Sequence, residues 1–131
     1  MAKKRNNNGQ QKVGLVEDVT IKGEKSVKTR ALFDTGATRT SIDMRIAAKA
    51  KLGPIIDVIR LRSKTAHTSI RRPIVKAKLK LKQREIEVKA NIEDRSKMSY
   101  PVLIGRDAIY GHFIIDLKKS HKSNNAKDTK K

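Results

Sequence analysis

The strongest constraint on the fold is a pair of consecutive segments, 74–82 and 85–92, in which apolar side chains occupy every second position. A two-residue period is typical of strands that bury one face and expose the other. We therefore predict a β-hairpin in which Leu81 lies opposite Ile86. This register also places Lys80 opposite Glu87, so that opposite charges meet on the exposed face.

The rest of the chain predicts further strands and little helix. Residues 13–21 alternate in the same way, with Leu15 and Val19 on one face, and residues 26–33 form a second strand after a glycine-containing turn. One helix is predicted within residues 41–54 by its alanines and lysines.

The predicted helix has a signal at each end. Asp43 can cap its start, and the Gly53-Pro54 pair stops it. Because the remaining segments are short strands and turns, the expected fold class is all-β with one or two short helices. The expected architecture is a small closed β-barrel or sandwich.

The chain carries a large excess of positive charge, with 32 Lys and Arg against 13 Asp and Glu and a formal net charge of +19. Its 131 residues suffice for one domain with a modest core. Residues 1–12 carry +4 and residues 118–131 carry +5, and both ends are polar. We therefore expect one domain over residues 13–117 between two disordered basic tails.

Several classes of protein are excluded by what the sequence lacks. Without cysteine there can be neither a disulfide nor a thiolate metal site. No apolar stretch follows the basic N-terminus and no run approaches membrane-spanning length, so we expect a cytoplasmic protein without membrane contact. His67, His112 and His121 lack the spacing of a zinc site, and no glycine-rich phosphate loop occurs, so no metal or other cofactor is expected.

The candidate chemistry lies in "ALFDTGATRTSID", residues 31–43. Asp34 follows an apolar strand that ends at Phe33, and Gly36 permits a sharp turn. Such a turn can simply cap itself, without any catalytic role. The context favours chemistry, because "YPVLIGRDAI", residues 100–109, follows about 65 residues downstream with its own apolar run and Gly-Arg-Asp turn.

In this order and at this spacing, the two motifs resemble the retropepsin family, the single-domain aspartic proteases typified by the retroviral proteases. The resemblance extends over roughly residues 13–117. It is nearest to the cellular branch of bacteria and archaea, some of whose members carry the name ATP-dependent zinc protease. It implies a retropepsin-like closed β-barrel, one lobe of an aspartic protease, and an aspartic endopeptidase that works as a homodimer.

The resemblance also assigns the catalytic residue. Aspartic proteases use two carboxyl groups that share one proton, one as a base towards water and one as an acid towards the carbonyl oxygen. Asp34 needs such a partner, and six other aspartates between residues 13 and 117 lack the Thr-Gly turn: Asp18, Asp43, Asp57, Asp94, Asp107 and Asp116. The partner is therefore expected to be Asp34 of a second, identical chain across a two-fold axis.

Neighbouring motif positions take roles by the same resemblance. Thr35 is expected to hydrogen-bond across the two-fold axis, and Gly36 to present its carbonyl to the substrate backbone. Ala37 and Thr38 are expected to line the substrate site. Structural support is expected from Thr40, Gly105, Arg106 and Asp107, with Asp107 bonding near Thr40 to hold the active-site loop.

Residues 56–75 occupy the place of the flap, a β-hairpin that closes over bound peptide. The segment "HFIIDL", residues 112–117, is the candidate dimer seam, with a core strand as the alternative. The tip of the flap, "SKTAHTS", contains no glycine, unlike retroviral flaps. The substrate-binding residues expected at this tip are Ser63, Lys64, Thr65, Ala66 and His67.

The positive charge has three interpretations. It can keep the protein soluble, bind nucleic acid non-specifically through the tails, or attract an acidic polypeptide substrate. Few aromatic residues argue against a dedicated nucleic-acid module, and the cellular branch is linked to glutamate-ligase systems. Besides an aspartic endopeptidase, the function hypotheses are a non-proteolytic or specialised peptide-processing relative acting on Glu-rich polypeptides and a basic RNA-associated protein.

Overall fold

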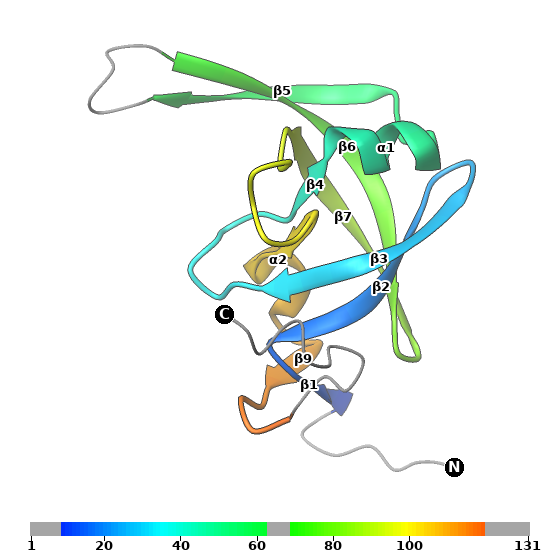
Figure 1. The fold of residues 1–131 in the computed structure, drawn as a ribbon, viewed down its shortest axis with the longest axis vertical. Helices are drawn as coiled ribbons and strands as arrows, with labels where there is room; N and C mark the ends of the chain where they lie inside the picture. The colour runs from blue at the N-terminus through cyan, green and yellow to red at the C-terminus, as the bar shows by residue number, and fades with distance from the viewer. Residues whose placement is uncertain (1–8, 63–68, 120–131) are drawn as a thin grey trace.

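The computed structural model describes residues 9–62 and 69–119, which are mostly strands with two short helices (Figure 1). No helix in these two ranges is long and apolar enough to cross a membrane. The strands are β1 (Gln11–Val13), β2 (Val16–Lys22), β3 (Ser26–Phe33), β4 (Ser41–Asp43), β5 (Ile55–Arg62), β6 (Ser69–Leu81), β7 (Arg84–Glu93), β8 (Val102–Ile104) and β9 (Phe113–Ile115), and the helices are α1 (Met44–Ala50) and α2 (Arg106–Ile109).

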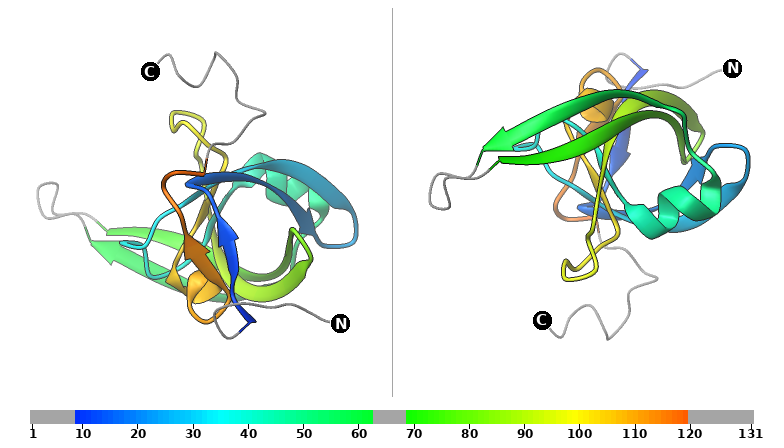
Figure 2. Two further views of the ribbon diagram at one scale, coloured as in Figure 1. Left: turned by 90° about the horizontal axis from the view of Figure 1, so that it is seen from below. Right: turned by 90° about the horizontal axis from the view of Figure 1, so that it is seen from above.

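Six strands close into a barrel in the order β2-β3-β8-β4-β7-β6, because β6 pairs with both β7 and β2. Figure 2 shows these strands curving round a common axis. Strand β5 pairs with the part of β6 that extends past the barrel, while β1 and β9 form a separate two-stranded parallel sheet. The predicted all-β closed barrel is confirmed.

Strand β8 lies between β3 and β4, parallel to the first and antiparallel to the second. Phe33 at the end of β3 pairs with Ile104, and Ser41 at the start of β4 pairs with Leu103. The loop from residue 34 to residue 40 therefore lies beside the Gly-Arg-Asp turn that follows β8. The Asp-Thr-Gly and Gly-Arg-Asp motifs, which are far apart in the sequence, therefore meet at the end of β8.

The β6–β7 hairpin is present, but the predicted register is wrong by two residues. Ile86 lies opposite Leu79 rather than Leu81, and the predicted charge pairs shift with it. A shift of two keeps every apolar side chain on the same face, so the alternation cannot distinguish the two registers. The turn decides between them, because Lys82 takes a positive φ of 59° and Leu81 then pairs with Arg84.

The prediction of a single strand over residues 13–21 is wrong, because the strand is interrupted at Gly14. Strand β1 ends at Val13 and β2 begins at Val16, which leaves Leu15 exposed. The N–H of Gly14 donates to Oε2 of Glu17 at 2.7 Å instead of joining a sheet ladder. Strand β1 consequently pairs with β9 and not with a barrel strand.

The predicted helix is shorter than its segment, since residues 41–43 form β4. Asp43 does cap α1, accepting a hydrogen bond from the backbone N–H of Arg45 at 3.0 Å. The helix ends at Ala50, because Lys51 adopts the left-handed conformation with a φ of 57°. The N–H of Lys51 donates to carbonyls of the last turn, as a left-handed C-terminal cap requires.

The barrel interior holds most of the apolar side chains of the alternating strands, with Leu15 as an exposed exception. Phe113 of β9 joins this core and meets the ring of Phe33 edge-on, with the centroids 5.6 Å apart. The terminal two-stranded sheet is therefore attached to the barrel by aromatic packing. The core residues of the β6–β7 hairpin are Ala77, Leu79, Leu81, Ile86, Val88 and Ala90.

The hairpin of β5 and β6 projects beyond the barrel (Figure 1). Most of β5 is exposed, including the apolar side chains of Ile55, Ile56, Val58 and Leu61. Exposed apolar side chains that gather on one element are common at binding surfaces. The predicted tip residues Ser63, Lys64, Thr65, Ala66 and His67 lie outside the described residues.

Candidate active site

Asp34 stands at the first turn after β3 and is half-buried. Its backbone N–H donates to the carbonyl of Ile104 at 2.9 Å, which continues the β3–β8 pairing by one residue. Its carboxylate oxygen Oδ1 accepts the N–H of Gly36 at 2.9 Å, and its carbonyl accepts the N–H of Ala37 at 3.1 Å. The side chain is therefore oriented by its own turn.

Gly36 leaves the room that this orientation needs. A β-carbon at residue 36 would lie 3.2 Å from Oδ1 of Asp34, a tighter contact than side chains normally make. Thr35 and Gly36 are exposed and Ala37 is half-buried, so this part of the loop is open to an approaching molecule. The residues expected to contact substrate or a partner thus have the accessibility that such contacts require.

Arg106 reaches back from α2 to hold the loop. Its guanidinium donates to the carbonyl of Thr35 at 2.9 Å and to the hydroxyl of Thr38 at 3.1 Å, and its backbone N–H donates to the carbonyl of Ala37 at 2.8 Å. These three bonds span most of the turn. The Gly-Arg-Asp motif and the Asp-Thr-Gly motif are therefore directly connected.

Asp107 binds the end of the same loop. Both of its carboxylate oxygens lie 3.1 Å from the N–H of Thr40, and Oδ1 accepts the Thr40 hydroxyl at 2.7 Å. The Thr40 hydroxyl in turn accepts the N–H of Gly105 at 3.2 Å. A β-carbon at residue 105 would lie 2.7 Å from the backbone of Arg39, so only glycine allows this close approach.

Asn91 of β7 completes the support and was not singled out by the sequence. It is buried, and its side-chain amide donates to Oγ of Ser41 at 2.9 Å and to the carbonyl of Thr40 at 3.3 Å. In the sequence it occupies an outward position of an alternating strand, where a polar residue is ordinary. Its role becomes visible only once β4 is placed beside β7.

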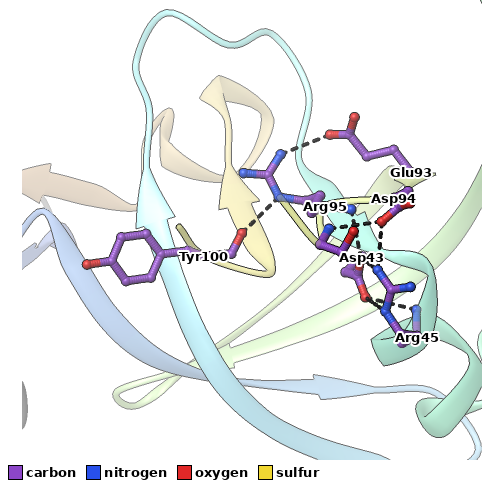
Figure 3. A network of polar contacts seen from close by, with 7 residues as sticks. Asp43, Arg45, Glu93, Asp94, Arg95 and Tyr100 are labelled. Atoms are coloured by element: carbon purple, nitrogen blue, oxygen red, sulfur yellow. Dashed lines mark hydrogen bonds and ion pairs between the residues drawn. The ribbon is translucent and has the colours of Figure 1, made fainter. Parts of the chain in front are cut away.

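The far end of β4 enters a network of charged side chains (Figure 3). Asp43 accepts the backbone N–H of Arg95 at 2.7 Å and the guanidinium of Arg45 at 2.9 Å. Buried Arg95 donates to Glu93 at 2.9 Å and to the carbonyl of Tyr100 at 3.0 Å. Burial opposes the charge of Asp43, but the backbone donors of Arg95 and Arg45 and the Arg45 guanidinium outweigh it, so its pKa is below the ordinary value.

This network also reaches the projecting hairpin. Glu93 pairs with Arg72 of β6 at 3.0 Å through its second carboxylate oxygen. Arg72 lies opposite Ile59, near the base of the β5–β6 hairpin. The hairpin and β4, the strand that follows the Asp34 loop, are therefore joined by consecutive ion pairs and hydrogen bonds.

Within residues 9–62 and 69–119, no second Asp or Glu joins Asp34 in a hydrogen bond. The same ranges contain no group of three His, Asp or Glu side chains arranged to hold a metal ion. Among the described residues, Asp34 is therefore a carboxylate without an acidic partner.

A family model matches residues 43–125, which is more than half of the chain, and its description is retropepsin-like aspartic endopeptidase RimB. The chain belongs to this RimB-like family. The matched segment begins after the Asp34 turn and does not include Asp34. The comparison with curated proteins gives no significant match.

Solved structures show the fold of this RimB-like chain. Protein Lpg0085 of unknown function from Legionella pneumophila superposes with a TM-score of 0.60 at 22% identity, covering 86% of this chain and 98% of that one. Simian foamy virus (mac) protease gives 0.55 at 19% identity, with 72% and 90% covered. The EIAV protease in complex with the inhibitor HBY-793 gives 0.56 at 18% identity, with 72% and 83% covered. The barrel is therefore of the retropepsin type.

Proposed function

We propose that this chain is an aspartic endopeptidase whose active site forms between two copies, each contributing Asp34. The observation that carries the proposal is the Asp34 turn itself. The carboxylate is oriented by Gly36, the turn is held by Arg106, and both features belong to a single-lobe retropepsin-like barrel. Membership of the RimB-like family agrees with this chemistry.

Two carboxyl groups brought together across a two-fold axis cannot both ionise readily, so they titrate as a coupled pair that holds one proton. The ionised Asp34 accepts a proton from a water molecule, which attacks the peptide carbonyl. The neutral Asp34 of the partner copy donates its proton to the carbonyl oxygen. Proton transfer to the leaving nitrogen then completes the cleavage of the peptide bond.

The exposed Thr35 and Gly36 are the surfaces through which the two copies and the substrate approach. The segment 112–117 is a proposed part of the seam. Phe113 belongs to the core of its own chain, but Ile114 and Ile115 are only half-buried. Strands β1 and β9 pair with each other alone among the described strands, so their outer edges can accept another copy.

The β5–β6 hairpin is the proposed flap. Its projection from the barrel and its exposed apolar side chains suit a segment that closes over an extended peptide. Closure would exclude water and add backbone hydrogen bonds to the substrate. The ion pair between Arg72 and Glu93 anchors this hairpin at its base.

One observation favours a narrower substrate class, an acidic polypeptide. Arg60 lies directly opposite Arg71 on the hairpin, and Arg62 is on the same face. None of these three forms an ion pair with a described acidic residue. Like charges placed opposite each other destabilise a hairpin, and a Glu-rich substrate would compensate them.

The decisive experiment compares wild type and Asp34→Asn on a peptide library that includes Glu-rich and neutral sequences. Proteolysis by wild type that is absent from Asp34→Asn supports the endopeptidase. Cleavage that survives the substitution rules out Asp34 as the catalytic group. Binding of Glu-rich peptides without cleavage would indicate a non-proteolytic relative. A salt-dependent RNA complex that disappears when residues 1–12 and 118–131 are removed would indicate an RNA-associated protein.

A further inference from the structure

A pocket on the outside of the barrel lies where β2 leaves β6. Its volume is about 360 Å³, and it is lined by Lys22, Gly23, Lys76, Ala77, Lys78 and Glu87. Strand β2 pairs with β6 only as far as Lys22 opposite Lys78, and β5 begins to pair at Val75. On this edge of β6, neither strand pairs with Lys76 or Ala77. The pocket therefore arises from a gap in the strand pairing of the backbone and not from side-chain positions alone.

The charges around this pocket are not balanced. Lys22 pairs with Glu85 at 2.5 Å, and Lys76 pairs with Glu87 at 3.8 Å. Lys78 makes no ion pair with any residue in the described ranges. The lining itself carries three lysines against one glutamate. The concave surface of the pocket therefore carries an excess of positive charge.

The strand register places lysines of neighbouring strands next to one another at this pocket. Lys22 of β2 lies directly opposite Lys78, and Lys76 lies directly opposite Lys89, while Glu87 of β7 lies opposite Lys78 on its other side. Like charges placed opposite each other across neighbouring strands are destabilising. The hydrogen bond and charge of Lys22, followed by the charges of Lys78 and Lys80, lower the pKa of Glu85, which agrees with a positive field here.

We propose that this pocket, the lysine pocket, binds a small anion that carries two or more phosphate or carboxylate groups. The lysine ammonium groups would act as mobile point charges towards the anion. A volume of about 360 Å³ lies at the small end of the range for ligand sites. The site uses neither Asp34 nor its supporting loop, so the proposal is independent of the proteolytic one.

The test is a titration of the ¹⁵N-labelled full chain with tripolyphosphate and, separately, with citrate at physiological ionic strength. We expect saturable shift changes centred on the amides of Gly23, Ala77 and Lys78. Comparison of the two anions distinguishes phosphate from carboxylate recognition. Shift changes confined to residues outside the lysine pocket, or no saturation with either anion, would overturn the proposal.

Two matched variants separate a site from general attraction to a basic protein. Lys78→Met removes one charge in the pocket, and Lys97→Met removes one exposed charge in the loop between β7 and β8. We expect Lys78→Met to weaken anion binding about fivefold or more, since it removes a close charge, and Lys97→Met to leave it nearly unchanged. Equal weakening by both variants would show non-specific attraction only and would refute the site. Far-ultraviolet circular dichroism of both variants confirms that each is folded.

Discussion

Asp107 holds the end of the Asp34 loop, because its carboxylate accepts both the N–H and the hydroxyl of buried Thr40. Asp107→Ala would leave these buried donors without a partner, at a cost of about 1–3 kcal/mol in unfolding free energy. Asp107→Asn keeps one acceptor oxygen and should cost less. Urea unfolding of the three proteins checks this order. Equal stability of Asp107→Ala and wild type would show that the contact contributes nothing.

Asp43 links stability to acid pH. Its pKa in the folded chain is below the ordinary value of 3.8, so its charged form stabilises the fold. This contribution is fully present above pH 3.8 and is lost as the pH falls through the lower folded pKa. Asp43→Asn should therefore destabilise the chain at neutral pH and lose less stability than wild type on acidification. Thermal melts between neutral pH and pH 2 test it, and parallel curves for the two proteins would contradict it.

At the residue scale the sequence indicated the candidate catalytic aspartate, but not all of the residues that support its loop. The Asp34 turn and the Gly-Arg-Asp turn are short-range patterns, and hydrogen bonds from Arg106 and Asp107 join them. Asn91 and Arg95 act through strands and loops that are distant in the sequence. A polar residue in an alternating strand, or an arginine in a loop, has no local pattern that reveals a buried role.

At the scale of elements, a substitution at the C-terminal end of α1 should increase the stability of the chain. Lys51 takes a left-handed conformation that costs a lysine more than a glycine. Lys51→Gly should therefore stabilise the chain by about 0.5–1 kcal/mol. Lys49→Gly, in the last turn of the same helix, should destabilise it by about 1 kcal/mol. Chemical denaturation of both variants measures the contrast, and equal losses would show that the φ of Lys51 is not limiting.

The strands also show which features the hydrophobic period of the sequence does not predict. Strands β6 and β7 follow from the two-residue period, because burial of one face enforces it. The period cannot fix a register to better than two residues, and Lys82 gives no sign of its positive φ. Gly14 similarly interrupts a strand whose pattern continues across it. Turn geometry, which depends on tertiary contacts, supplied what the pattern lacked.

For the whole molecule, the central prediction is that activity belongs to a pair of chains. If each active site needs Asp34 from both copies, an exchanged mixture of equal amounts of wild type and Asp34→Asn contains about one quarter wild-type pairs. Because the total number of pairs doubles, adding an equal amount of the inactive chain should halve the cleavage rate, and a larger excess should reduce it towards zero.

The same mass of an unrelated protein controls for crowding and adsorption. A rate that stays constant as Asp34→Asn is added, after equilibration long enough for subunits to exchange, would mean that a single chain carries a complete site. Sedimentation at the assay concentration shows whether the chains are single or paired. It therefore separates an active single chain from pairs that fail to exchange subunits.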